Sequence, residues 1–341
     1  MTSLPGMDVD ALRTFLASEG IDVRGQLRVE LISGGRSNLT FKAYDDESTW
    51  IVRRPPVSGL TPSAHDMARE YTVARGLQGT GVPVARTVAF DEHGRALGAP
   101  TTVVEFVDGR VVRDAADLSA LTDAQVQANA HALVRVLADL HAVDYEAVGL
   151  GTLGRPQGFV ARQVKLWAGQ WDRVKTRDLP DVAALHSALA ESTPHSTAAS
   201  IVHGDFRIDN TILDAADPTV VRAVVDWELS TIGDPMTDVA LMCVYRSPVF
   251  DLVLGMDAAW TSTRLPSADE LAQAYATASG RDLADWNFYL ALANFKLGVI
   301  GEGITHRALQ GSSAGSGAER AAEATPEFMA AGLRAIKGVS S

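Results

Sequence analysis

The sequence has 341 residues, of which 46% are hydrophobic, and a formal net charge of −12. Its length suits about two domains of ~150 residues each, and its apolar fraction excludes a disordered chain. The acidic balance argues against sequence-independent nucleic-acid binding, because such binding depends on Lys and Arg neutralising phosphates. The single cysteine, Cys243, excludes an intrachain disulfide and a cysteine-based zinc site.

Targeting signals are not evident in the sequence. The opening residues MTSLPGMDVD lack the basic start and apolar core of a signal peptide. No run reaches the ~18 apolar residues of a membrane span. We therefore expect a cytoplasmic protein that binds neither membranes nor nucleic acid, and the oligomeric state is not indicated.

The first hundred residues have the pattern of a small sheet with one main helix. Helical spacing predicts a leading helix over residues 7–19 and the main helix over residues 63–77. Short β-like runs predict antiparallel strands at residues 27–32, 39–44 and 49–52, in a run ending at Phe90, and at residues 101–107. The third strand continues into Arg53 and Arg54, whose side chains point in opposite directions if it stays extended.

A turn of small residues separates the first two predicted strands. It contains Ser33, Gly34, Gly35, Ser37 and Asn38. Glycines let a backbone approach a ligand closely, and successive N–H groups can then surround phosphate oxygens. The turn therefore predicts a phosphate-binding loop, although a plain hairpin turn has the same composition.

The remainder of the chain is predominantly helical. Helices are predicted at residues 128–141, 157–174, 182–189, 239–245, 267–278, 283–305 and 318–336, with a flexible linker at residues 310–317. This change of pattern divides the chain into an N-terminal lobe of residues 1–106 and a helical C-terminal lobe of residues 107–341.

Two segments carry the chemistry. The first, IVHGDFRIDN at residues 201–210, places Asn210 five positions after Asp205, and the second, VVDWELSTIGDPMTD at residues 224–238, places Asp226 after an apolar run. Phosphoryl transfer needs one carboxylate to accept the proton of the attacking hydroxyl. It also needs a carboxylate and an amide oxygen to hold Mg²⁺. We expect Asp205 in the first role and Asn210 with Asp226 in the second.

These two motifs resemble the aminoglycoside phosphotransferase-like, or choline-kinase-like, branch of the protein-kinase fold. The resemblance extends over roughly residues 25–305. It implies an α+β, two-lobed fold with a small antiparallel sheet in the N-lobe and a larger, mostly helical C-lobe. WIVRRPP followed by AHDMAREY further resembles the subgroup whose relatives are fused to acyl-CoA dehydrogenases.

The resemblance also implies roles for residues outside the two motifs. Arg53 stands where kinases have a lysine that meets the nucleotide phosphates and a helical glutamate, here Glu70. Glu105, Phe106 and Val107 correspond to the hinge, whose backbone groups meet the adenine. Arg207 either steadies the transferring phosphate or pairs with a structural acid. Arg54 is expected to be a surface charge.

Four further side chains are expected to support the site without taking part in the chemistry. We expect His141 to be a packed, hydrogen-bonded residue and His203 to brace the catalytic loop. Asp209 is expected to be a solvated turn residue. Asp238 is expected to cap the next helix or to brace the catalytic loop.

The implied function is transfer of the γ-phosphate of ATP or GTP, with Mg²⁺, to a hydroxyl of a small molecule. One alternative is a regulatory pseudokinase, suggested by Arg53 in place of lysine. Another is a metal-dependent phosphoester hydrolase that needs no ATP. The acceptor stays open between aminoglycosides, amino alcohols, sugars and a hydroxyacyl-CoA: the acidic chain favours a cationic acceptor, whereas the subgroup resemblance favours the acyl-CoA.

Overall fold

The computed structural model describes residues 4–33, 38–57, 66–311 and 317–338. The chain forms two compact units. Unit 1 comprises Met1–Asp108 and the later segment Ala223–Ser230, and unit 2 comprises Gly109–Arg222 and Thr231–Ser341. In the described residues, no helix is both long and apolar enough to cross a membrane.

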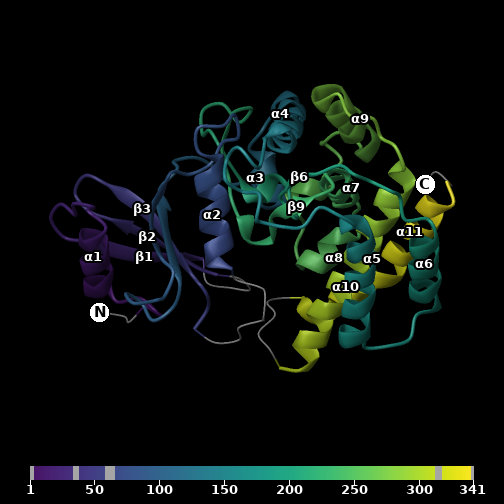
Figure 1. The fold of residues 1–341 in the computed structure, drawn as a ribbon, viewed down its shortest axis with the longest axis horizontal. Helices are drawn as coiled ribbons and strands as arrows, with labels where there is room; N and C mark the ends of the chain where they lie inside the picture. Colours follow the sequence, from purple (N-terminus) through teal and green to yellow (C-terminus); the bar gives the residue numbers. More distant parts are fainter. Residues whose placement is uncertain (1–3, 34–37, 58–65, 312–316, 339–341) are drawn as a thin grey trace. The chain divides into compact units, whose positions relative to one another are not determined.

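Unit 1 contains the predicted antiparallel sheet (Figure 1). Its strand order is β1–β2–β3–β5–β4, and the strands are β1 (Arg28–Ser33), β2 (Leu39–Tyr44), β3 (Thr49–Arg54), β4 (Thr87–Asp91) and β5 (Thr101–Glu105). Burial alternates along β2 and β3, as expected for strands with one face on a core. The five strands therefore lie close to their predicted positions.

The core of this sheet is completed by α1 (Val9–Ser18), the predicted leading helix. Asp8 caps it by accepting a hydrogen bond from the Ala11 N–H. Its buried Leu12 and Leu16 pack with strand residues such as Phe41 and Val52. Removing each of these four side chains from water stabilises the folded state by roughly 1.5–3 kcal/mol.

The main helix of unit 1, α2 (Met67–Leu77), begins later than predicted, with Asp66 as its N-cap. Glu70 lies in its first turn and is buried. Within the same unit, α2 packs against the short helix η2 (Trp227–Leu229). The Arg69 guanidinium donates to the Ser230 carbonyl at 2.6 Å, which fastens the returning segment to the helix.

Unit 2 is built around α10 (Trp286–Leu309), which packs against α5 (Phe159–Val174), α6 (Pro180–Glu191), α7 (Met236–Val244) and α11 (Thr325–Ile336) (Figure 1). A second group pairs α4 (Asp123–Ala142) with α9 (Ala268–Ser279). The short helix α3 (Ala115–Ser119) precedes α4 in the sequence, and α8 (Phe250–Leu254) lies between α7 and α9. Helices α4, α5, α6, α7, α9 and α10 confirm the predicted helical pattern.

Short strands hold the motif segments of unit 2. Strands β6 (Ser200–Val202) and β9 (Thr231–Gly233) pair antiparallel, with Ile201 opposite Ile232. β6 ends directly before His203, so the pairing fixes the start of the catalytic motif. The motif continues through η1 (Ile208–Asn210) into β7 (Thr211–Leu213), and β8 (Val221–Val224) leads back to unit 1.

Two predictions about the fold are wrong. The closing helix over residues 318–336 is divided into η4 (Ala318–Ala324) and α11, because Pro326 lacks an N–H and begins a new helix. Arg54 is buried rather than a surface charge, and it donates to the backbone carbonyls of Gly6 and Leu97. Most of the predicted linker lies outside the described residues.

Candidate active site

The predicted site residues fall into two sets, and each set lies within one unit. Unit 1 holds Asn38, Arg53, Glu70 and Asp226, whereas unit 2 holds Asp205, Arg207 and Asn210. The structure therefore defines the geometry within each set.

Arg53 joins two carboxylates of unit 1. One terminal nitrogen of its guanidinium lies 2.8 Å from Glu70 Oε1, and the other lies 3.1 Å from Asp226 Oδ1. The expected ion pair between Arg53 and Glu70 is therefore present. Burial raises the pKa of Glu70, and the guanidinium opposes that shift. An arginine can make both contacts because its nitrogens are spread over a planar fork.

Two buried polar atoms of this pair lack partners. Arg53 Nε and Glu70 Oε2 form no hydrogen bond with any described residue. Buried polar groups are nearly always paired, so an orphaned donor next to an orphaned acceptor marks a place where a polar ligand fits. A phosphate oxygen would satisfy the arginine donor, and a metal-bound water would satisfy the glutamate acceptor.

Asp226 is held in the left-handed region, with φ 68° and ψ 57°. This conformation is uncommon outside glycine and is enriched at functional sites. The following Trp227 is buried and donates from its indole to the Val224 carbonyl at 3.0 Å, which anchors the turn. Because Arg53 contacts only Oδ1 of Asp226, Oδ2 has no protein partner among the described residues and can serve a cation.

Glu228 adds a third acid to unit 1. It accepts a hydrogen bond from the buried Asn38 amide at 3.0 Å. Burial and the Asp226 carboxylate raise the pKa of Glu228 to about 7. The cluster therefore carries more carboxylate than its one arginine neutralises, but no three acids of the described residues are grouped so that they alone could hold a metal ion.

The predicted phosphate-binding turn is only partly described. Ser33 ends β1, Asn38 precedes β2, and Gly34, Gly35 and Ser37 lie outside the described residues. Asn38 uses its side-chain amide toward Glu228. Contact between this turn and phosphates stays a prediction.

The predicted hinge follows β5. The Glu105 N–H donates to the Arg86 carbonyl at 2.8 Å, and the Phe106 N–H donates to the Thr49 carbonyl at 3.1 Å. Both N–H groups therefore already donate to backbone carbonyls of unit 1. The Val107 N–H has no backbone partner in the described part of the chain and is the donor available to a ligand.

In unit 2, the Asp205 carboxylate is held by three side chains. Oδ1 accepts from the Tyr245 hydroxyl at 2.5 Å and from Arg207 Nε at 3.2 Å, and Oδ2 accepts from Asn210 Nδ2 at 3.1 Å. Burial disfavours its charge, but Arg207 and Tyr245 hold the pKa of Asp205 below its ordinary value. The carboxylate is thus fixed in one orientation and ionised.

Asn210 is oriented by the same loop. Its Nδ2 also donates to the Asp205 carbonyl at 2.8 Å, so both hydrogen bonds of the side chain use the amide nitrogen. Oδ1 is left without a protein partner among the described residues. A hard cation prefers such an amide oxygen, so the donor set on this chain fits the predicted Mg²⁺ ligands.

Arg207 pairs with acids on both sides. It contacts Asp205 at 3.2 Å and Asp209 at 2.8 Å, and it lies over the Tyr245 ring. The expectation that Asp209 is a solvated turn residue is wrong, because its carboxylate pairs with Arg207 and its side chain is only 21% exposed. Burial raises the pKa of Asp209 to about 6, although Arg207 opposes the shift. Of the two roles considered for Arg207, the structure contains the pairing with acids.

Asp238 braces the loop, as predicted. Its two oxygens accept from the His203 N–H at 2.6 Å and the Gly204 N–H at 2.8 Å. Gly204 has φ 84°, which a residue with a side chain rarely adopts.

His141 is buried and lies 2.7 Å from the Tyr275 hydroxyl and 3.4 Å from Asp238. His203 Nδ1 accepts from the Asp205 N–H at 3.2 Å. Both histidines therefore have the structural roles expected.

Two residues at this site were not predicted. Tyr245 donates to Asp205, and Lys296 Nζ donates to the Gly204 carbonyl at 2.9 Å. They lie 40 and 92 positions from their partners. Neither belongs to a spaced motif, so no sequence signal links them to the loop.

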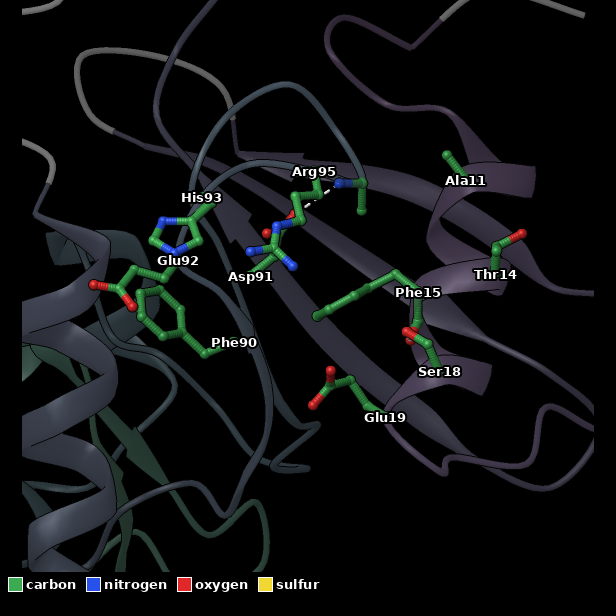
Figure 2. A pocket seen from close by; sticks show the side chains of 11 residues that line it. Ala11, Thr14, Phe15, Ser18, Glu19, Phe90, Asp91, Glu92, His93 and Arg95 are labelled. Carbon is green, nitrogen blue, oxygen red and sulfur yellow. Dashed lines mark hydrogen bonds between the residues drawn. The ribbon is translucent and has the colours of Figure 1, made fainter.

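Two pockets lie away from these side chains. One, of about 540 Å³, is in unit 1. Figure 2 shows Phe15 of α1 and Glu19, which follows that helix, on one side of it and His93 and Arg95, which follow β4, on the other. A second, of about 400 Å³, is lined by α5, α6 and Phe295 of α10. No predicted site residue lines either pocket.

Comparison with known proteins agrees with this arrangement of motifs. Residues 28–289 match the model of the phosphotransferase enzyme family. The chain is 31% identical to human acyl-CoA dehydrogenase family member 11 over 306 residues, covering 89% of this chain and 39% of that protein. It is 32% identical to a probable acyl-CoA dehydrogenase, IBR3, of Arabidopsis thaliana, covering 92% and 40%. The chain thus spans about two fifths of the length of these relatives.

Among solved structures, a crystal structure of a putative aminoglycoside phosphotransferase from Ralstonia eutropha is 32% identical, with a TM-score of 0.82 and coverage of 98% of this chain and 99% of that one. An aminoglycoside phosphotransferase solved with AMP-PNP and hygromycin B has a TM-score of 0.59 at 15% identity, covering 96% and 98%. The predicted α+β, kinase-like fold class is confirmed.

Proposed function

Because this chain belongs to the phosphotransferase enzyme family, we propose that it transfers the γ-phosphoryl group of ATP or GTP, with Mg²⁺, to a hydroxyl of a small molecule. The observation that supports this proposal most directly is the Asp205 carboxylate, ionised and held by Tyr245, Arg207 and Asn210. Such a group can orient a hydroxyl for attack at phosphorus.

The chain's own residues have distinct roles in this proposal. Asp205 orients the acceptor hydroxyl and takes its proton as the new P–O bond forms. Since the pKa of Asp205 is lowered, the proton moves late, when the attacking oxygen has become strongly acidic. Arg207 and Tyr245 keep the carboxylate in position, so most of the rate comes from orientation.

The nucleotide is assigned to residues with unused polar atoms. In unit 1, Arg53 Nε would meet a phosphate oxygen, the Val107 N–H would meet the adenine and Asp226 Oδ2 would offer an oxygen ligand to Mg²⁺. In unit 2, Asn210 Oδ1 would offer an amide oxygen ligand. When bound, Mg²⁺ neutralises charge on the phosphate oxygens. Solved structures with AMP-PNP and ADP support a nucleotide in this family.

The acceptor is not assigned by the relatives. The solved relatives include aminoglycoside phosphotransferases, and the curated relatives include acyl-CoA dehydrogenase family members, of which the chain spans only 30–42%. We propose a hydroxylated metabolite and leave its class to the contacts around Asp205.

The test is ADP release from Mg-ATP over a panel of hydroxylated metabolites. Asp205→Asn and Asp226→Asn should each lower turnover by about 10²- to 10⁴-fold, because each removes a charge needed in the transition state. The matched control is Asp139→Asn, which neutralises an exposed aspartate on α4. Turnover of the two site variants equal to that of the control would refute the assignment.

A further inference from the structure

The pocket of unit 2 that is lined by α5, α6 and α10 has aromatic walls. Its volume is about 400 Å³, within the range of ~300–1,000 Å³ that is usual for small-molecule sites. Trp171 of α5 and Phe295 of α10 line it and are both buried. His186 of α6 also lines it and is stacked with the Phe295 ring, with 6.3 Å between the ring centroids. The pocket therefore offers flat ring surfaces to a ligand.

The wall formed by the connection between α5 and α6 is fastened to α10. The Thr176 N–H donates to Oε1 of the buried Glu302 at 3.0 Å, and the Arg177 guanidinium lies 3.6 Å from Oε2 of the same side chain. Leu179 and Pro180 follow these residues and line the pocket where α6 begins. A wall that is already held in place loses little conformational freedom when a ligand binds.

The same pocket is lined by charged side chains of both signs. Asp172 lies in the last turn of α5, Lys175 is the C-cap of that helix, and Asp178 follows in the connection to α6. All three are exposed, and none forms an ion pair with another residue in the described part of the chain. A ligand that carries both an ammonium and a carboxylate would meet an opposite charge with each group.

We propose that this pocket binds an aromatic amino acid. The ring of the ligand lies against the three rings of the pocket, its ammonium faces the two aspartates and its carboxylate faces Lys175. Burial of the ring supplies most of the affinity, because aromatic side chains remove a large apolar area from water. The charged groups supply selectivity, since exposed ion pairs contribute little free energy.

This site is separate from the proposed reaction centre of the same unit. Phe295 and Trp171 neighbour residues that support the catalytic loop: Phe295 precedes Lys296, whose Nζ donates to the Gly204 carbonyl at 2.9 Å, and Trp171 lies one turn after Trp167 on α5. No residue of the catalytic loop itself lines the pocket. The ligand also needs no hydroxyl, so it is not the phosphoryl acceptor.

The experiment measures binding to the full chain by titration calorimetry without nucleotide. The probes are phenylalanine, phenethylamine, which lacks the carboxylate, 3-phenylpropionate, which lacks the ammonium, and alanine, which lacks the ring. Ala183→Phe places a ring in the pocket, and the matched control is Ala184→Phe, the next exposed alanine of α6, which does not line it. Lys175→Met and the double variant Asp172→Asn, Asp178→Asn remove the charges of each sign.

Phenylalanine should bind the parent most tightly. Phenethylamine and 3-phenylpropionate should each bind about two- to fivefold more weakly, the value of an exposed ion pair, and alanine should not bind detectably. Lys175→Met should weaken binding of phenylalanine but not of phenethylamine, and the double aspartate variant should weaken binding of phenylalanine but not of 3-phenylpropionate. Ala183→Phe should weaken all three aromatic probes by at least about tenfold, because their ring is no longer buried, and Ala184→Phe should not.

Three results would overturn the proposal. Failure of the parent to bind phenylalanine at millimolar concentration would show that the pocket is not its site. Equal binding of the three aromatic probes, or of phenylalanine and alanine, would show that the pocket does not recognise both charges and the ring. Binding that survives in Ala183→Phe but is lost in Asp205→Asn would place the ligand at the catalytic loop. None of these measurements requires ATP turnover, so the proposal and the proposed function can fail independently.

Discussion

Arg53 is the residue whose chemistry departs most from the kinase pattern. Kinases place a lysine on this strand, whereas Arg53 contacts Glu70 and Asp226 through separate nitrogens, at 2.8 and 3.1 Å. A lysine would present one ammonium to both carboxylates. The substitution therefore changes geometry more than charge, and it links the helical glutamate directly to the proposed metal ligand.

The contribution of Arg53 to stability can be measured by urea denaturation. Arg53→Met should lower the free energy of unfolding by about 3 kcal/mol, because Glu70 would stay buried without its counter-charge. Arg53→Lys should lower the free energy of unfolding by less, since lysine keeps the positive charge. The double variant Arg53→Met, Glu70→Leu should recover part of the loss. An Arg53→Met protein as stable as the parent would show that the pair does not stabilise the fold.

At the scale of elements, the turn between β2 and β3 depends on one carboxylate. Asp45 is buried and accepts from the backbone N–H groups of Glu47, Ser48 and Arg24 at 2.6–2.8 Å. Burial opposes ionisation, but these three donors hold the pKa of Asp45 below its ordinary value. The hairpin that presents Arg53 is thus tied to an ionised aspartate.

This arrangement predicts a pH-dependent stability. A lowered folded-state pKa adds stability above the unfolded pKa of about 3.9 and loses it as pH falls through the folded value. Asp45→Asn should therefore be less stable than the parent by about 1–2 kcal/mol at pH 7, with the gap closing below about pH 4. Urea denaturation at several pH values tests this, with the exposed neighbour variant Asp46→Asn as control. A gap independent of pH would contradict it.

The packing of α10 depends on its glycines to different degrees. A Cβ on Gly301 would lie 2.8 Å from the Ala321 carbonyl oxygen of η4, whereas a Cβ on Gly303 would meet nothing closer than 3.7 Å. Backbone atoms cannot rotate away as a flexible side chain can. Close approach of η4 to α10 therefore requires glycine at position 301 only.

Alanine at the two positions should change the free energy of unfolding in opposite directions. Gly301→Ala should lower the free energy of unfolding by about 1–3 kcal/mol through overpacking. Gly303→Ala should raise it by up to about 1 kcal/mol, because alanine is the better helix former. Thermal denaturation of both variants tests this. Equal effects at the two positions would show that η4 does not constrain the helix.

Over the whole molecule, local pattern predicted most of the fold, and the two motifs predicted the acids and the amide of the candidate site. Alternation and helical spacing located β1 to β5 and the long helices because each buries one face. Strands β6 and β9, three residues each, were missed because their pairing depends on contacts far apart in the sequence. Tyr245 and Lys296 were missed for the same reason, since a single side chain reaching a distant loop leaves no periodicity.

Misjudged burial accounts for the remaining differences. Arg54 precedes a pair of prolines, and Asp209 precedes an asparagine. Charged residues in such surroundings are usually exposed. In the folded chain their partners come from Gly6 and Leu97 and from Arg207. The partners of Arg54 lie more than 40 positions away, so the sequence around it does not reveal them. The partner of Asp209 is two positions away, but only the folded loop brings the two side chains together and partly buries the carboxylate.

The central claim is that this chain moves a γ-phosphoryl group to an organic hydroxyl by means of Asp205. The most direct test follows labelled γ-phosphate from Mg-ATP during incubation of the purified chain with hydroxylated acceptors. We expect the label to appear covalently on one acceptor, to require Mg²⁺, and to be lost in Asp205→Asn. Label that remains on ATP while the nucleotide binds, or phosphoester cleavage that proceeds without ATP, would contradict the account.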